Sequence, residues 1–161
     1  MPISVLFVCT ANSARSIMAE AVLNELGGGR FRAFSAGSRP SGRVDPIALE
    51  VLAKNGYGAQ GLRSKSWQEF ARDGAERLDF VISVCDDAAG EDWPAFRGRP
   101  VSAHWHVPDP AAAPGSAAQR RRVFLEALGT LRRRIQAFTS LPFESVDKVA
   151  LRSQLSEIGE S

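Results

Sequence analysis

The sequence predicts a single α/β domain with a mostly parallel sheet, and three observations support this fold class. Short apolar runs alternate with segments of helical periodicity along the 161 residues. The first run, residues 5–8, is apolar without interruption and rich in β-branched and aromatic side chains, which is typical of a strand buried on both faces of a parallel sheet. We find no internal repeat, linker or low-complexity segment, so we expect one domain over residues 1–161.

The N-terminal half alternates strand and helix. Residues 18–26 follow the first strand as a predicted helix, which a run of three glycines ends. Residues 31–36 form a predicted second strand. Asp45 and Pro46 suit the N-cap and the first position of a second helix, which ends near residues 55–56.

The middle of the chain adds a short helix and two further strands. Ser66 and Glu69 have the spacing of a capping box, which predicts a short helix after Ser66. Residues 80–84 are the predicted third strand and residues 101–104 a weaker fourth strand. The acidic, Gly and Pro content between them predicts a loop over residues 86–98.

The C-terminal third is predicted to be helical. Residues 117–140 form a long helix with an apolar stripe at helical spacing: Phe124, Leu128, Leu131, Ile135 and Phe138. Four arginines share its polar face: Arg121, Arg122, Arg132 and Arg133. A nucleic-acid contact is one interpretation, but a net charge of only +2 favours a solvated face, so we expect no nucleic-acid partner. Residues 145–158 form a predicted tail helix with Val146, Val149 and Leu155 on its apolar side.

Cysteine content and hydropathy indicate the compartment in which the protein works. Two cysteines are too few for a disulfide scaffold, which favours a reducing compartment. The N-terminus begins directly with the first strand and shows no signal pattern, and no apolar run approaches the length of a membrane span. We therefore expect a cytoplasmic protein without a membrane partner.

A loop of small polar residues joins the first predicted strand to the first helix. It begins at Cys9 and carries Arg15 six positions later. Backbone N–H groups at a helix N-terminus lack intrahelical partners and can bind an anion. Together with Arg15 they favour a thiolate, so we expect the pKa of Cys9 to lie well below its ordinary value of about 8.5. The alternative is an ordinary buried thiol.

Arg15 completes the predicted anion site. Its guanidinium can bind two oxygens of a tetrahedral oxyanion and so place the central atom over the sulfur. We expect the oxyanion to be bound by the rest of the loop: Thr10, Ala11, Asn12, Ser13, Ala14, Arg15 and Ser16.

Two further candidates follow later strands. In open parallel sheets, ligands bind beyond the carboxyl ends of the strands, where the strand order reverses. Cys85 follows the third strand, and Asp109 lies between two prolines in the loop over residues 106–116. If the first and third strands are neighbours, we expect both residues to line the same crevice as Cys9. The alternatives are an apolar core role for Cys85 and a turn role for Asp109.

These motifs carry a family resemblance. The Cys-x5-Arg-Ser loop with the later Asp109-Pro110 pair resembles the low-molecular-weight protein tyrosine phosphatase fold. Within that fold, the residues of these motifs are similar to those of arsenate reductases, and the similarity extends over nearly the whole chain. The likeness rests on residues 9–16 (CTANSARS), 35–38 (SAGS), 65–67 (KSW), 84–86 (VCD), 103–105 (AHW) and 107–111 (VPDPA).

The resemblance implies a fold and a set of roles. The expected sheet has four parallel strands in the order 2-1-3-4, flanked by helices. Asn12 corresponds to the asparagine that shapes the loop, and Ser16 to the hydroxyl that hydrogen-bonds the thiolate. The catalytic roles fall on four residues: Cys9 as nucleophile, Arg15 as oxyanion clamp, Asp109 as general acid and Cys85 as second redox thiol.

Three positions depart from the family pattern. Asp92-Trp93 precede Pro94 where many thioredoxin-coupled members carry a third cysteine, so a relay from the second to a third thiol cannot operate. Ala14 replaces an extra loop cysteine of some relatives. His106 stands where glycine is expected, which affects the shape of the loop before Asp109.

The resemblance implies reduction of arsenate to arsenite. Cys9 attacks arsenic, Asp109 protonates the departing oxygen, and a second thiol then attacks the Cys9 sulfur. That thiol is Cys85 or glutathione, and the missing third cysteine favours glutathione with glutaredoxin. We expect no bound cofactor, only an external reductant delivered by glutathione with glutaredoxin or by thioredoxin.

Two rival functions use the same residues. A phosphatase would hydrolyse a phospho-cysteine with water, but the residues after Asp109 lack the aromatic side chains of the family's phosphatases: Pro110, Ala111, Ala112 and Ala113. A non-enzymatic anion-binding module is more remote, because such modules tend to lose the nucleophile or the arginine. His104 and His106 could suggest zinc with the cysteines, but the spacing is poor, so we expect no metal.

Overall fold

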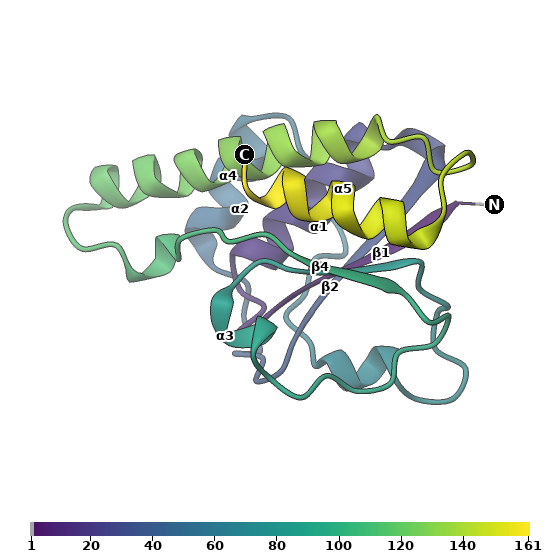
Figure 1. Ribbon diagram of the computed structural model, residues 1–161. Helices are drawn as coiled ribbons and strands as arrows, with labels where there is room; N and C mark the ends of the chain where they lie inside the picture. The colour runs from purple at the N-terminus through teal and green to yellow at the C-terminus, as the bar shows by residue number, and fades with distance from the viewer. Residues whose placement is uncertain (1) are drawn as a thin grey trace.

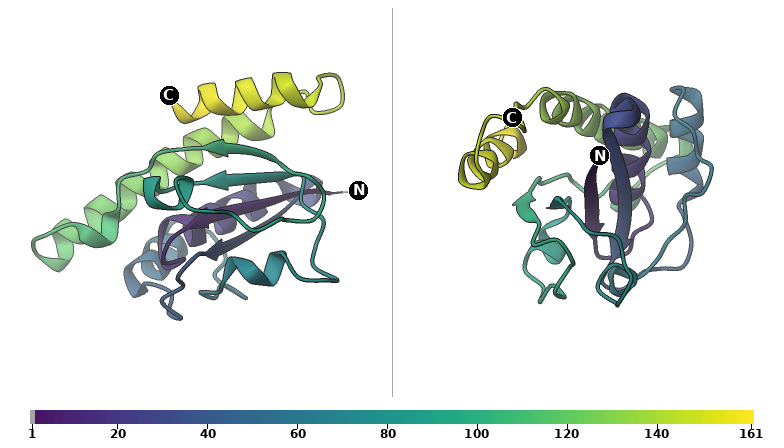
Figure 2. Two further views of the ribbon diagram at one scale, coloured as in Figure 1. Left: turned by 60° about the horizontal axis from the view of Figure 1, so that its bottom comes forward. Right: turned by 90° about the vertical axis from the view of Figure 1, so that its right-hand side faces the viewer.

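The computed structural model describes residues 2–161 and contains a parallel sheet covered by helices (Figure 1). Its four strands are β1 (Ile3–Cys9), β2 (Phe31–Gly37), β3 (Phe80–Ser83) and β4 (Val101–His104). They lie in the order β2-β1-β3-β4, and each pair of neighbours is parallel (Figure 2). The predicted fold class and strand order are therefore confirmed.

The register of the sheet positions the site. β1 pairs with β2 on one side and with β3 on the other, and Val8 is opposite Ser83 in the β1–β3 ladder. Cys9 and the residues that follow Ser83 therefore leave neighbouring strands at the same carboxyl edge. This is the point at which the strand order reverses, where open α/β sheets bind ligands.

Helices cover both faces of the sheet. Phe31 packs on Phe138 of α4 (Ala117–Thr139), whereas Phe34 packs on Phe70 of the 3₁₀ helix η2 (Trp67–Phe70). Side chains three residues apart in a strand point to opposite faces, so α4 and η2 lie on opposite sides. The remaining elements are α1 (Arg15–Leu26), η1 (Gly28–Arg30), α2 (Pro46–Lys54), α3 (Asp86–Ala89), η3 (Pro110–Ala112) and α5 (Lys148–Gly159).

The long helix α4 supplies the centre of an aromatic cluster. All five residues of its predicted apolar stripe are buried. Phe138 alone contacts four aromatic rings, at centroid distances of 5.2 to 6.1 Å: Phe31, Phe80, Trp105 and Phe143. On the opposite face of α4, the four arginines predicted to be solvated are exposed, and Arg121 pairs with Glu50 of α2 at 3.0 Å.

The predicted capping box at Ser66 is wrong in part. The Ser66 hydroxyl does cap η2, by accepting from the backbone N–H of Gln68, but Glu69 turns away to Arg63 at 2.6 Å. A cation within reach competes better for the carboxylate than a backbone N–H does. A complete capping box, which the sequence reasoning missed, starts α4 at Ser116 and Gln119.

The predicted loop over residues 86–98 contains the short helix α3. Asp86 and Asp87 lie in its first turn, where carboxylates interact favourably with the helix dipole. At its other end the indole of Trp93 donates to the carbonyl of Ala88 at 2.7 Å. This single turn depends on a tertiary contact with Trp93, which local sequence patterns do not reveal.

The tail helix begins later than predicted. Asp147 caps α5 by accepting from the N–H of Ala150, so the helix starts at Lys148. Leu151 and Leu155 are buried, whereas Val149 is 80% exposed. Val149 was therefore wrongly assigned to the apolar side, because two positions along a helix place it nearly opposite Leu151. None of the helices over residues 2–161 combines the length and apolar character needed to cross a membrane.

Replacing Phe138 by alanine should remove the centre of the aromatic cluster. We expect the Phe138→Ala variant to lose about 3–5 kcal/mol of unfolding free energy in urea denaturation, because a large buried ring leaves a cavity. The Leu125→Ala variant is the control on the same helix, since Leu125 is 48% exposed. It should stay within about 0.5 kcal/mol of the native chain. Equal losses in the two variants would contradict this description of the core.

Candidate active site

The loop after β1 turns its carbonyl groups outward. The backbone N–H of Arg39 donates to the carbonyl of Thr10, that of Ser41 to Ala11, and that of Asp45 to Ser13, at 2.9–3.0 Å. Among the described residues, no hydrogen bond occupies the backbone N–H groups on the inner side of the loop: Ala11, Ser13, Ala14 and Arg15. Free N–H groups at the start of α1 are well suited to bind an anion.

Asn12 holds the loop in its unusual turn. It is buried, and its φ of 47° lies in the left-handed region that asparagine tolerates better than most residues. Its side chain donates to the Ser16 hydroxyl and accepts from the backbone N–H of Lys65, both at 2.8 Å. The role that the resemblance implies for Asn12 thus has a geometric basis in this chain.

Gly37 permits the close approach of β2 to the loop. A Cβ atom at this position would lie 2.9 Å from the carbonyl oxygen of Cys9 and would also clash with that of Thr10. The N–H of Gly37 donates to the carbonyl of Lys65 at 2.9 Å. Any side chain here would push apart the two segments that support Asn12.

The Cys9 thiol is buried at the base of the loop. Its Sγ lies 3.0 Å from the Ser16 hydroxyl and 3.3 Å from the backbone nitrogen of Asn12, which donates to it. Since Asn12 donates to the Ser16 oxygen, the Ser16 hydroxyl is free to donate to the sulfur. Both contacts favour negative charge on Cys9.

Cys85 lies close to Cys9, and each thiol shifts the pKa of the other. The hydrogen bond from Cys9, and others from Ala88 and Thr10, lower the pKa of Cys85 to about 5, against the effect of its burial. The hydrogen bond to Cys85, and then burial, raise the pKa of Cys9 well above its ordinary value. The expected low pKa of Cys9 is therefore corrected. These shifts favour negative charge on Cys85 rather than on Cys9.

Arg15 and Asp109 meet at the mouth of the loop. One Arg15 nitrogen donates to the carbonyl of Val107 at 3.0 Å, and the other lies 3.8 Å from Asp109 Oδ2. The second oxygen of Asp109 accepts from the N–H of Ala111 at 3.0 Å. The structure thus brings the four predicted catalytic residues into two contacting pairs, Cys9 with Cys85 and Arg15 with Asp109.

Sequence reasoning assigned no role to two residues that support the loop. Glu91 accepts from the Ser38 hydroxyl at 2.7 Å and from the Thr10 hydroxyl at 3.4 Å. Lys65 supplies the N–H that holds Asn12, and its ammonium lies 3.8 Å from Glu20 in a largely buried pair. Burial raises the pKa of Glu20 and lowers that of Lys65. In the sequence, only the KSW motif at residues 65–67, which is part of the family resemblance, points to Lys65.

The two histidines form a cluster with an aspartate and not with the cysteines. Among residues 2–161, the one group of three or more ligating side chains with ligand atoms within 4.8 Å of one another is Asp86, His104 and His106. Neither cysteine belongs to it. The ring of His106, which stands where glycine was expected, turns to Asp86, and its carbonyl accepts from Arg134.

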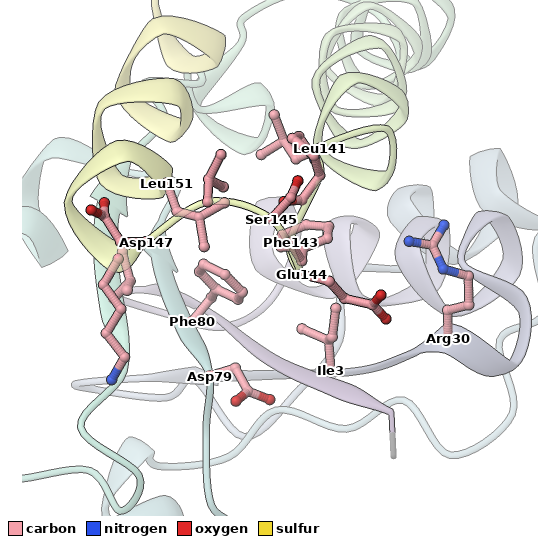
Figure 3. A pocket seen from close by; sticks show the side chains of 14 residues that line it. Ile3, Arg30, Asp79, Phe80, Leu141, Phe143, Glu144, Ser145, Asp147 and Leu151 are labelled. Carbon is pink, nitrogen blue, oxygen red and sulfur yellow. The ribbon is translucent and has the colours of Figure 1, made fainter.

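A cavity of about 1000 Å³ opens at the opposite end of the sheet (Figure 3). Ile3 and Phe80, at the starts of β1 and β3, line it together with Phe143, Leu151 and a ring of charged residues. No residue of the loop over residues 9–16 contributes to it. The cavity is therefore separate from the site at the carboxyl edge of the strands.

The chain has clear relatives among known proteins. The family model described as low molecular weight phosphotyrosine protein phosphatase matches residues 4–150. An arsenate reductase of Halalkalibacterium halodurans is 29% identical, covering 82% of this chain and 91% of the relative. A glutaredoxin arsenate reductase of Synechocystis sp. is 30% identical over 82% of this chain and 92% of that protein.

Solved structures agree with this relationship. An arsenate reductase in its phosphate-binding state matches 86% of this chain and 97% of its own, with a TM-score of 0.70 and 29% identity. The resemblance drawn from the sequence motifs is therefore confirmed for both the fold and the family.

The mutual pKa shifts of Cys9 and Cys85 predict how the two thiols titrate. A thiol is deprotonated above its pKa, so the ultraviolet absorbance of one thiolate per native chain should persist at neutral pH and disappear as the pH falls through about 5. The Cys9→Ala variant retains Cys85 alone. Because its main hydrogen-bond donor is gone, the midpoint should move to higher pH. An unchanged titration midpoint of Cys85 in the Cys9→Ala variant would show that Cys9 does not lower the pKa of Cys85.

Proposed function

The chain belongs to the low molecular weight phosphotyrosine protein phosphatase family, and we propose that it acts within this family as an arsenate reductase. The observation that carries the proposal is that Cys9 and Cys85 lie at the ends of neighbouring strands, at the same edge of the sheet, with Cys85 Sγ 3.7 Å from the hydroxyl of Thr10, the residue after Cys9. Hydrolysis of a phosphate ester needs one thiol and a water molecule. Reduction of arsenate needs two electrons, which a pair of adjacent thiols supplies when it forms a disulfide.

Binding places arsenate against the loop. The oxygens of a tetrahedral dianion are bound by the guanidinium of Arg15 and by the free N–H groups of the loop: Ala11, Ser13, Ala14 and Arg15. In the empty site Arg15 lies 3.8 Å from Asp109. An incoming anion competes with this carboxylate for the arginine, which leaves Asp109 beside the bound oxygens.

The first chemical step forms a bond between sulfur and arsenic. The proton of Cys9 passes to the Cys85 thiolate with which it is hydrogen-bonded, and Cys9 becomes the nucleophile. Cys9 then attacks arsenic while Asp109, which takes up a proton from solvent once the anion has displaced it from Arg15, gives that proton to the departing hydroxyl, which leaves as water. The Ser16 hydroxyl, 3.0 Å from the sulfur, stabilises the thiolate in this step.

The second step transfers the electrons. The sulfur of Cys85 attacks the sulfur of Cys9, the new S–S bond forms, and the S–As bond breaks with its electron pair remaining on arsenic. Arsenic is thereby reduced from the pentavalent to the trivalent state, both cysteines are oxidised, and the Cys85 proton goes to an arsenite oxygen. One hydrogen arsenate, one thiolate, one thiol and the proton delivered by Asp109 give one arsenite, one disulfide and one water.

The disulfide is then reduced by an external thiol. The chain lacks the third cysteine of thioredoxin-coupled relatives, and Trp93 packs on α3 in that region. The electrons therefore come from glutathione with glutaredoxin, or from thioredoxin, in a cytoplasm that keeps thiols reduced. The name of the Synechocystis relative, a glutaredoxin arsenate reductase, supports the first of these partners. Direct attack of glutathione on Cys9 would bypass Cys85.

Variants of the two cysteines test the proposed reaction. With arsenate, glutathione and glutaredoxin, Cys9→Ser should reduce arsenite production to background, because no adduct forms. Cys85→Ala should also lose turnover, while its equilibrium affinity for arsenate stays within about twofold of the native value because the loop is intact. Full turnover by Cys85→Ala would refute a redox role for Cys85. Hydrolysis of an aryl phosphate without reduction of arsenate would instead favour the phosphatase.

The arginine clamp can be tested by binding alone. Arg15→Lys keeps the charge but loses the planar fork, so affinities for both arsenate and phosphate should fall about tenfold or more. Calorimetric titration of the reduced protein measures both. Arg133→Lys, at an exposed position of α4, is the matched control and should bind like the native chain. Equal affinities in the two variants would remove Arg15 from the anion site.

A further inference from the structure

We propose that Asp86, His104 and His106 form a binding site for a divalent transition-metal ion such as Zn²⁺. The proposed activity makes no use of these three side chains. They lie at the carboxyl edge of the sheet, one residue beyond Cys85, and all three are at least partly exposed to solvent.

The ligand atoms already converge. Asp86 Oδ1 lies 2.7 Å from His104 Nε2 and 3.0 Å from His106 Nδ1. A tetrahedral metal with bonds of about 2.1 Å holds its ligand atoms roughly 3.4 Å apart. The cluster therefore needs only small outward movements of three solvent-accessible side chains to admit an ion.

The backbone and a neighbouring hydroxyl orient both rings. His104 ends β4 and His106 follows two positions later, so the two side chains point to the same side of an extended segment. The other ring nitrogen of His104 is hydrogen-bonded to the Ser83 hydroxyl at 2.8 Å, which directs Nε2 at Asp86. Hydrogen bonding of the second nitrogen is typical of metal-ligating histidines. Arg134 holds the carbonyl of His106 at 2.6 Å.

The donor set and the local charge favour a borderline metal. Two imidazole nitrogens and one carboxylate suit Zn²⁺ and its neighbours in the first transition row, and they leave a fourth position for water. Residues 86–92 contain no lysine or arginine but carry four carboxylates that raise the local concentration of cations: Asp86, Asp87, Glu91 and Asp92.

This site differs from the one that the sequence excluded. The expectation of no metal considered the histidines together with the cysteines, whose spacing is poor. Asp86 is the missing third ligand, and it follows Cys85 directly in the chain. A bound cation would therefore place positive charge close to the Cys85 thiolate.

Histidine NMR offers a direct test because the chain contains only two histidines, both in the proposed site. Zn²⁺ is titrated into the metal-free, reduced native protein while the ring nitrogen signals are recorded. We expect both rings to respond with one saturable site, with His104 bound through Nε2 and His106 through Nδ1. Zinc that saturates the thiols while both ring signals stay unchanged would overturn the proposal.

Two matched variants identify the carboxylate ligand. Asp86→Asn and Asp87→Asn remove the same charge from adjacent positions of α3, but only Asp86 touches the histidines. Asp86→Asn should weaken the zinc response of the histidine signals at least tenfold, whereas Asp87→Asn should leave it within about twofold. Equal affinities in the two variants would show that the rings do not bind zinc together with Asp86.

Discussion

Asn12 accepts a hydrogen bond from the backbone of Lys65 and donates one to Ser16, and these two bonds keep the catalytic loop in its left-handed turn. The turn presents the free N–H groups to an anion and places Ser16 against the Cys9 sulfur. Gly37 allows the supporting segment to approach closely enough for this arrangement. Packing of β1 between β2 and β3 then fixes the loop relative to Cys85.

The charged groups of the site lie in two pairs. The interaction between Cys9 and Cys85 raises the pKa of Cys9 and lowers that of Cys85, and Arg15 is balanced by Asp109. A thiolate on Cys85 is stabilised by hydrogen bonds from Ala88 and Thr10 against the cost of its desolvation. In the proposed reaction an oxyanion takes the place of Asp109 beside the arginine, and transfer of the Cys9 proton to Cys85 converts the Cys9 thiol into the nucleophile. Binding and activation therefore use contacts that the empty protein already contains.

Much of this organisation could be predicted from the sequence, because it depends on local patterns. The apolar strand before Cys9, the spacing to Arg15 and the following helix identify the anion loop without tertiary information. The direction of the Cys9 pKa could not be predicted in this way, since it depends on Cys85 from a neighbouring strand. The contacts of Glu91 with the loop, and of Asp86 with two histidines, likewise join residues that only the fold brings together.

The central claim is that Cys85 resolves the adduct on Cys9 within the same chain. A single turnover without any external thiol tests it most directly. The reduced protein is mixed with arsenate, and both the arsenite released and the disulfide formed are measured by mass spectrometry. This account predicts one equivalent of arsenite and a disulfide between Cys9 and Cys85. Release of arsenite only after glutathione is added, with glutathione attached to Cys9, would contradict it.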